Sequence, residues 1–124
     1  MISLLLFALA AVCNAVMDVL AHKFSSSVFV RLNWTYWDPQ MSWGNKYTDN
    51  NKWYGWINDT ILVWVTDGWH LFQMLMKTSI VLAIVFYIPI THAWYWDIIL
   101  FTIAWGLVFE LFYKYLLILR KKSK

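Results

Sequence analysis

The chain has 124 residues, of which 61% are hydrophobic and 14% are charged. Soluble domains contain roughly 45 to 50% apolar and about 25% charged residues, so this composition excludes an ordinary soluble domain and predicts a single membrane domain over residues 1–124. The net charge of +3 is concentrated at the C-terminus. A nucleic-acid partner, which needs a basic surface spread over a fold, is therefore not expected.

The first predicted transmembrane helix covers residues 2–22. A cleaved signal peptide is the alternative, but no Lys or Arg precedes the apolar run and no small-x-small cleavage site follows it, so an uncleaved span is favoured. Asn14, Asp18 and His22 occur at intervals of four residues and therefore share one stripe of a helix. Alanines beside this stripe would let another helix approach closely. These alanines are Ala8, Ala11 and Ala15.

Residues 23–59 differ in kind from the apolar segments around them. They combine turn-forming residues with a high density of Trp and Tyr, which favour the membrane interface. Disorder is not expected at this aromatic content, so the segment is predicted to form a long, ordered loop that lies as a cap on the bilayer surface. Whether this cap contacts a substrate or only the interface stays open.

The second predicted transmembrane helix covers residues 60–88. A side-chain oxygen of Asn58, Asp59 or Thr60 is expected to cap its first turn. Pro89 cannot continue the helix and is expected to follow its end.

The third predicted transmembrane helix covers residues 94–118, with aromatic residues at both ends as interfacial anchors. Asp97 is expected only to interact favourably with the N-terminal dipole of this helix. Residues 119–124 form a basic tail. The predicted fold class is therefore an all-α integral membrane protein with three transmembrane helices.

The distribution of Lys and Arg predicts the orientation. Most of these residues lie in the 23–59 loop and near the C-terminus, whereas the N-terminus and the turn around His92 have none. Because positive residues are retained on the cytoplasmic side, the loop and the C-terminus are predicted to be cytoplasmic and the N-terminus outside, in a multi-pass protein of the cell's inner membrane.

Ionisable residues within the predicted spans indicate a functional site, because each unpaired charge in a membrane costs a few kcal/mol. Five of them, from all three helices, are expected at one depth in the cytoplasmic half of the membrane. Carboxylates and imidazoles together suit Zn, Mn, Fe or Mg, so they are predicted to bind a divalent metal ion. The predicted ligands are Asp18, His22, Asp67, His70 and Glu110.

The chemistry expected at this site is metal-activated water acting on a lipid-like or membrane-delivered substrate, with Asp67, His70 and Glu110 as the catalytic residues. A Gly-rich phosphate loop, a G-x-S-x-G elbow and an H-E-x-x-H motif are all absent from the sequence. Further polar residues are expected to support the ligands or to contact the substrate. They are Asn14, Gln73, Lys77, Tyr113 and Lys46.

Three alternatives remain open. The chain could be an oligomeric proton- or ion-coupled transporter or channel that uses Asp67, Glu110 and Lys77 at an interface between protomers. It could be an accessory subunit whose polar residues pair with a larger membrane partner. In the third alternative, Asp67 and His70 satisfy each other and only tie the structure together.

Overall fold

The computed structural model describes residues 1–44, 62–91 and 93–119, and within these ranges it contains helices and no strand. The prediction of an all-α protein is confirmed at this level. The helices are α1 (Ile2–Lys23), α2 (Trp34–Trp37), α3 (Pro39–Ser42), α5 (Gly68–Val85) and α6 (Trp94–Leu111). Shorter helical turns cover Phe24–Ser26, Val28–Arg31, Val63–Val65 and Phe112–Leu116.

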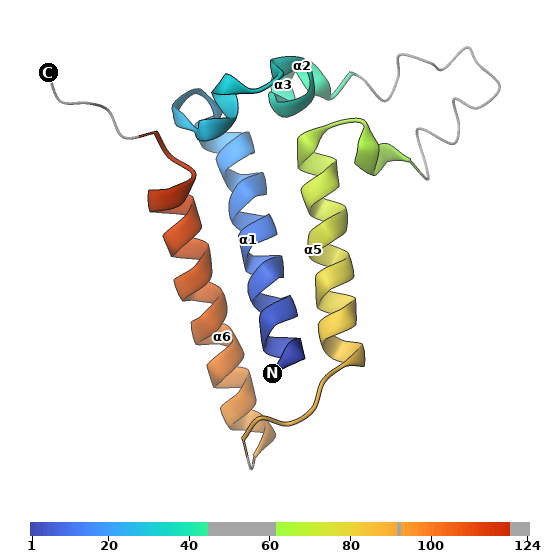
Figure 1. The fold of residues 1–124 in the computed structure, drawn as a ribbon, viewed down its shortest axis with the longest axis vertical. Coiled ribbons are helices and arrows are strands. Elements are labelled where there is room, and N and C mark those ends of the chain that lie inside the picture. Colours follow the sequence, from blue (N-terminus) through green and yellow to red (C-terminus); the bar gives the residue numbers. More distant parts are fainter. Residues whose placement is uncertain (45–61, 92, 120–124) are drawn as a thin grey trace, which may run out of the picture.

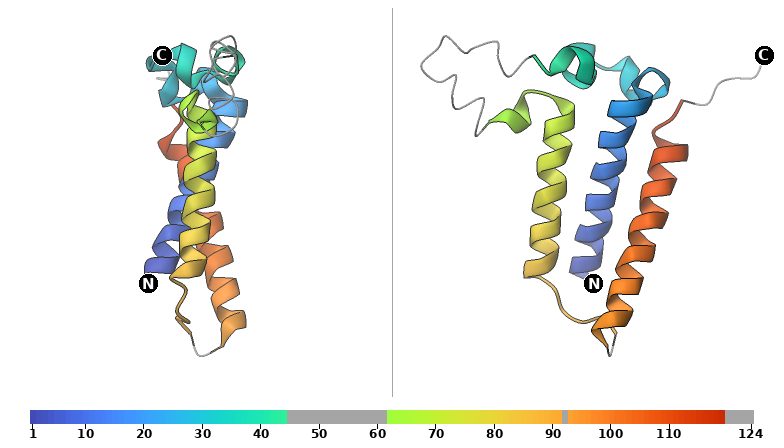
Figure 2. Two further views of the ribbon diagram at one scale, coloured as in Figure 1. Left: turned by 90° about the vertical axis from the view of Figure 1, so that its right-hand side faces the viewer. Right: turned by 180° about the vertical axis from the view of Figure 1, so that it is seen from behind.

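The three long helices stand side by side, with α1 between α5 and α6 (Figure 1; Figure 2, right). Because α5 runs opposite to α1 and α6, one end of the bundle holds the end of α1, the start of α5 and the end of α6. We call this the cap end. The opposite end holds the N-terminus and the connection from α5 to α6, and we call it the turn end.

Small side chains explain why α1 is the central helix. Ala10, Ala11 and Ala15 are fully buried, and α5 buries Ser79 and Ala83. Small residues at a helix interface let the two backbones approach closely. Of the predicted packing face, Ala11 and Ala15 are thus buried, whereas Ala8 is half-buried.

The outward faces of α5 and α6 are covered by large apolar side chains. Three helices are long and apolar enough to cross a membrane, over Ile2–Ser26, Gly68–Val85 and Trp94–Leu116. Soluble monomers rarely expose continuous apolar surface on this scale. Exposed members of these faces include Leu75, Val81, Val85, Ile103, Leu107 and Leu111.

The second long helix is shorter than the predicted span of residues 60–88. It begins at Gly68, where Asp67 is the N-cap, and it ends at Val85, before Pro89. The predicted capping residues 58–60 lie outside the described residues. Asp67 therefore stands at the first turn of the helix and not two to three turns inside it.

A small aromatic core joins the cap to the bundle. Trp37 of α2 stacks on Phe29 with ring centroids 5.1 Å apart, and it contacts Phe72 of α5. The chain after α6 is tied to the same region, because Val28 donates its N–H to the carbonyl of Leu117 at 2.9 Å. Within the predicted 23–59 loop, residues 23–44 are thus ordered helical turns over the cap end, and 45–59 lie outside the described residues.

Candidate functional site

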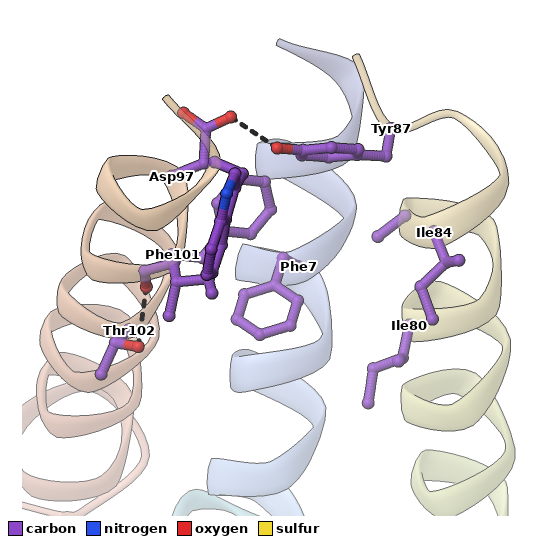
Figure 3. Close-up of a pocket in the computed structure, with 10 residues that line it drawn as sticks. Phe7, Ile80, Ile84, Tyr87, Asp97, Phe101 and Thr102 are labelled. Atoms are coloured by element: carbon purple, nitrogen blue, oxygen red, sulfur yellow. Dashed lines mark hydrogen bonds between the residues drawn. The ribbon is translucent and has the colours of Figure 1, made fainter. Parts of the chain in front are cut away.

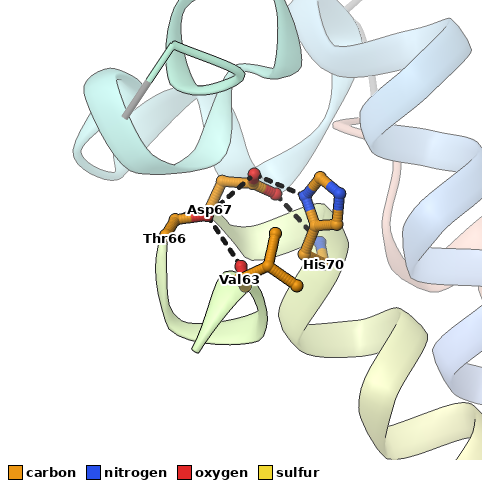
Figure 4. A network of polar contacts seen from close by, with 4 residues as sticks. All are labelled: Val63, Thr66, Asp67 and His70. Atoms are coloured by element: carbon orange, nitrogen blue, oxygen red, sulfur yellow. Dashed lines mark hydrogen bonds and ion pairs between the residues drawn. The ribbon is translucent and has the colours of Figure 1, made fainter. Parts of the chain in front are cut away.

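Asp67 caps α5 and at the same time holds the side chain of His70. Its Oδ1 accepts the backbone N–H of His70 at 2.9 Å, and its Oδ2 lies 2.6 Å from the ring Nδ1 of His70 (Figure 4). Asp67 is only 2% exposed. A buried carboxylate needs such partners, and the positive end of the helix dipole stabilises it further.

The contact with Asp67 orients the His70 ring. A carboxylate oxygen accepts hydrogen bonds and a ring N–H donates them, so the 2.6 Å contact suits a hydrogen on Nδ1 and directs Nε2 to the other side of the ring. The second ring nitrogen points away from Asp67 (Figure 4), and the side chain is 23% exposed. His70 is therefore oriented to accept a proton at Nε2, which is the arrangement of a general base.

The turn before α5 supports this pair. The hydroxyl of Thr66 donates to the carbonyl of Val63 at 2.7 Å and lies 3.5 Å from Oδ2 of Asp67 (Figure 4). Burial and the negative charge of Asp67 raise the pKa of Tyr36 in α2. Tyr36 therefore remains protonated at neutral pH beside the carboxylate.

Gly68 sets the distance between the cap and α5. A Cβ atom at this position would lie 2.6 Å from Cε3 of Trp37, which is closer than carbon atoms approach. The Trp37 ring therefore packs directly on the backbone at the start of α5. This contact positions α2, and with it α3, over the Asp67–His70 pair.

A pocket of about 140 Å³ lies beside the pair. Its walls come from the end of α1, from α3 and the residue after it, and from the start of α5. They consist of Ala21, Pro39, Ser42, Trp43, Asp67, Trp69 and His70. Pockets for drug-sized ligands hold roughly 300–1,000 Å³, so this one fits a small chemical group and not a whole lipid-like molecule.

Ser42 is the residue of this pocket that sequence reasoning missed. It is 1% exposed, and its Oγ has no hydrogen-bond partner among the described residues. Most buried hydroxyl groups in proteins have a partner. Ser42 and His70 are far apart in the sequence, and no sequence motif links them, so only the position of α3 over α5 brings both to one pocket.

The predicted divalent-metal centre is not supported by the described residues. No group of three or more His, Cys, Asp or Glu side chains there lies close enough to hold a metal ion. Asp67 and His70 do meet, but Glu110 forms an ion pair of 2.5 Å with Lys114 in the helical turn directly after α6, and the side chains of Glu110 and Lys114 are both about half exposed. Asp18 is half-buried in α1 and His22 is exposed at its end.

The predicted supporting residues are spread over the bundle. Asn14 and Gln73 are half-buried in α1 and α5, whereas Lys77 is exposed in the middle of α5. The ammonium group of Lys23 lies over the ring of Tyr113 in a cation–π contact, with Nζ 3.7 Å from the ring centroid. Lys46 lies outside the described residues. In the described part of the chain, no ion pair joins Lys77 to Asp67 or Glu110.

A second polar cluster lies at the turn end around Asp97. The carboxylate is 2% exposed and accepts hydrogen bonds from the hydroxyls of Tyr87 and Thr91 at 2.6 and 2.7 Å. It also accepts the backbone N–H groups of Ile90 and Thr91 at 3.0 and 2.8 Å. The hydrogen bond raises the pKa of Tyr87. Asp97 thus does more than the predicted dipole interaction, because it fastens the α5–α6 connection to α6.

An apolar cavity of about 500 Å³ opens next to this cluster, between α1, α5 and α6 (Figure 3). Phe7 of α1 faces it from one side, Ile80 and Ile84 of α5 from another, and Phe101 of α6 from a third. The Asp97 carboxylate on its rim is already occupied by four hydrogen bonds. The cavity therefore offers apolar contact and little chemistry.

The cap-end pocket is the stronger candidate for a functional site, because it combines an oriented imidazole with a buried hydroxyl that has no partner among the described residues. Comparison with protein-family models, with curated proteins and with solved structures gives no match for this chain.

Proposed function

We propose that this chain is an integral membrane protein that hydrolyses a lipid-like or membrane-delivered substrate, with His70 as the general base and Asp67 as the residue that positions it. The observation that carries the proposal is the 2.6 Å contact between Asp67 Oδ2 and His70 Nδ1 at the wall of the cap-end pocket. General base catalysis of this kind contributes about 10²- to 10⁴-fold to a rate.

The membrane part of the proposal is supported by the outward faces of α5 and α6, whose exposed Ile, Leu and Val side chains suit a lipid environment. The cap end is assigned to the cytoplasmic side. Lys23, Arg31 and Lys114 lie there, whereas the α5–α6 connection at the other end contains no Lys or Arg. The pocket would then lie at the cytoplasmic interface, where a substrate can enter from the bilayer.

The proposed step uses only residues of this chain. His70 accepts a proton from the water or hydroxyl group that attacks the substrate. The ionised Asp67 stabilises the imidazolium that forms. The predicted metal centre is not used in this scheme, since within the described ranges no third His, Cys, Asp or Glu side chain joins Asp67 and His70 in a metal-binding group.

The test is hydrolysis of a chain-length series of 4-nitrophenyl esters by the full-length protein in lipid nanodiscs. His70→Gln should lower the rate by about 100-fold or more, because Gln cannot accept and release a proton. Ser79→Ala, a change at a buried serine more than two helical turns further along α5, should leave it unchanged. Equal rates in wild type and His70→Gln would contradict the proposal.

A second candidate function, as a subunit of a larger membrane assembly, is favoured by Lys77. Its side chain is exposed near the middle of α5, about 13 Å from the helix start at 1.5 Å per residue. An ammonium group at the bilayer centre costs about 2.5 to 3.5 kcal/mol. An acidic residue of a neighbouring chain would remove this cost.

Native mass spectrometry should then show an oligomer for the wild-type protein, and Lys77→Leu should dissociate it. A monomer for both the wild-type protein and Lys77→Leu would exclude self-assembly through Lys77.

A further inference from the structure

We infer that Ser42 is the nucleophile of the cap-end pocket and that the substrate is a carboxylic ester of a long-chain amphiphile. The inference rests on the proposed role of His70 and Asp67, and it adds the attacking group and the bond that is cleaved. It is carried by the position of a buried hydroxyl, without a partner in the described chain, in the same pocket as an oriented imidazole.

The state of Ser42 is not explained by its helix. Its backbone N–H donates to the carbonyl of Asp38 at 2.8 Å, but its hydroxyl makes no such local bond, although Ser side chains in helices often do. Ser3 is the other buried serine whose Oγ lacks a partner within the described residues. Ser3 lies at the turn end, far from any His or Asp of the cap end, so it provides an internal control.

The pocket also limits what can react. A volume of about 140 Å³ holds an ester group with its nearest atoms, and the rest of the substrate has to extend outward. Trp43 at the pocket wall is 60% exposed and offers an apolar surface for a hydrocarbon chain. An indole at a membrane interface makes such contacts while its N–H stays hydrated.

The reaction balances with water as the second reactant. Oγ of Ser42 forms a bond to the ester carbonyl carbon while its proton passes to Nε2 of His70. The bond from that carbon to the alkoxy oxygen then breaks, and the alcohol leaves with the proton from His70. Water, deprotonated by His70, attacks the acyl group on Ser42, and the carboxylic acid is released as the proton returns to Oγ.

Within the described residues no hydrogen bond joins Ser42 to His70 across the pocket. Catalytic hydrogen bonds are often long before substrate binds and shorten in the reactive complex. The inferred step requires such a contact to form between two groups that line the same pocket.

The experiment is labelling of the full-length protein in nanodiscs with an alkyl fluorophosphonate, followed by peptide mass spectrometry. A single adduct on Ser42 is expected. Ser42→Ala should carry none, Ser3→Ala should label as wild type does, and His70→Gln should label about 100-fold more slowly. An adduct elsewhere, or none, would overturn the assignment of Ser42.

Ester hydrolysis separates this inference from the proposed function. If wild type hydrolyses the ester and His70→Gln does not, but Ser42→Ala keeps the full rate, then His70 acts on water directly and only the inference fails. If wild type shows no hydrolysis, the proposed function fails as well. Should Ser42→Ala not fold, Ser42→Cys keeps the size and the nucleophile, and its alkylation rate should fall when His70 is replaced.

Discussion

Asp67 has two roles that rest on different oxygen atoms. Oδ1 caps the helix by accepting the His70 N–H, and Oδ2 orients the His70 ring. Capping at this position stabilises a protein by about 1 kcal/mol whether or not the site reacts. The contact at Oδ2 gives the buried carboxylate a second partner and also fixes the orientation of the His70 ring.

Gly68 yields a prediction that concerns stability alone. Gly68→Ala places a methyl group against the Trp37 ring and should destabilise the protein by about 1 to 3 kcal/mol, as overpacked sites do. Thermal unfolding in detergent, followed by tryptophan fluorescence, measures this. Gly106→Ala is the control, because a Cβ there meets nothing within 4 Å, and it should stabilise α6 by about 0.5 to 1 kcal/mol. Equal effects of both changes would contradict the close contact with Trp37.

The sequence predicts that Asp67 and His70 meet, because their spacing of three places them on one side of a helix. In the structure the contact is instead one between an N-cap residue and the first turn of the helix. The expected meeting of Asp18 and Glu110 with this pair depended on a second helix that starts at residue 60, which put Asp67 deep in the membrane, whereas the helix starts at Gly68. Asp67 is itself a preferred N-cap residue, but Asn58, Asp59 and Thr60 offer the same signal earlier in the chain, so the sequence alone does not decide where the helix begins.

At the scale of elements, α1 organises the bundle through its buried alanines, and the connection from α5 to α6 is held by Asp97. The alanine face was predictable from spacing. The Asp97 cluster was not, because its donors come from a turn whose shape the sequence does not specify. Tyr87 and Thr91 belong to that turn, and both donate hydroxyl hydrogen bonds to the carboxylate.

The Asp97 cluster yields a prediction about local order. Asp97→Ala removes the acceptor of the Ile90 and Thr91 N–H groups and should increase the hydrogen exchange of these two amides by about 5-fold or more, since each lost hydrogen bond is worth about 1 kcal/mol or more. Tyr87→Phe removes a single hydroxyl and should change the two amides much less. Unchanged exchange in Asp97→Ala would show that the turn does not depend on this carboxylate.

At the scale of the whole molecule, the fold separates two environments. The cap end carries the polar pocket and an aromatic cover, and the outer faces of α5 and α6 are apolar. The chain of 124 residues thus places a small pocket beside the Asp67–His70 pair at one end of an apolar bundle. In the proposed function, the substrate reaches this pocket from the bilayer.

The predicted orientation is testable with single cysteines. In a Cys13→Ala background, Ser25→Cys lies at the cap end and Ile88→Cys near the turn end, and both positions are exposed. A membrane-impermeant maleimide added to intact cells should label Ile88→Cys, and it should label Ser25→Cys only after the membrane is opened. The reverse pattern would place the pocket on the outer side, and labelling of both in intact cells would contradict three spans.

Replacement of Asp67 by Asn tests the central claim most directly, because Asn still caps a helix but cannot stabilise an imidazolium. The measurement is the rate of ester hydrolysis by Asp67→Asn in nanodiscs over a range of pH, together with its melting temperature. We predict an unchanged melting temperature, a similar KM, a kcat lower by about 100-fold or more, and loss of the wild-type pH profile. A variant that melts like wild type and also hydrolyses like wild type would show that Asp67 only caps α5.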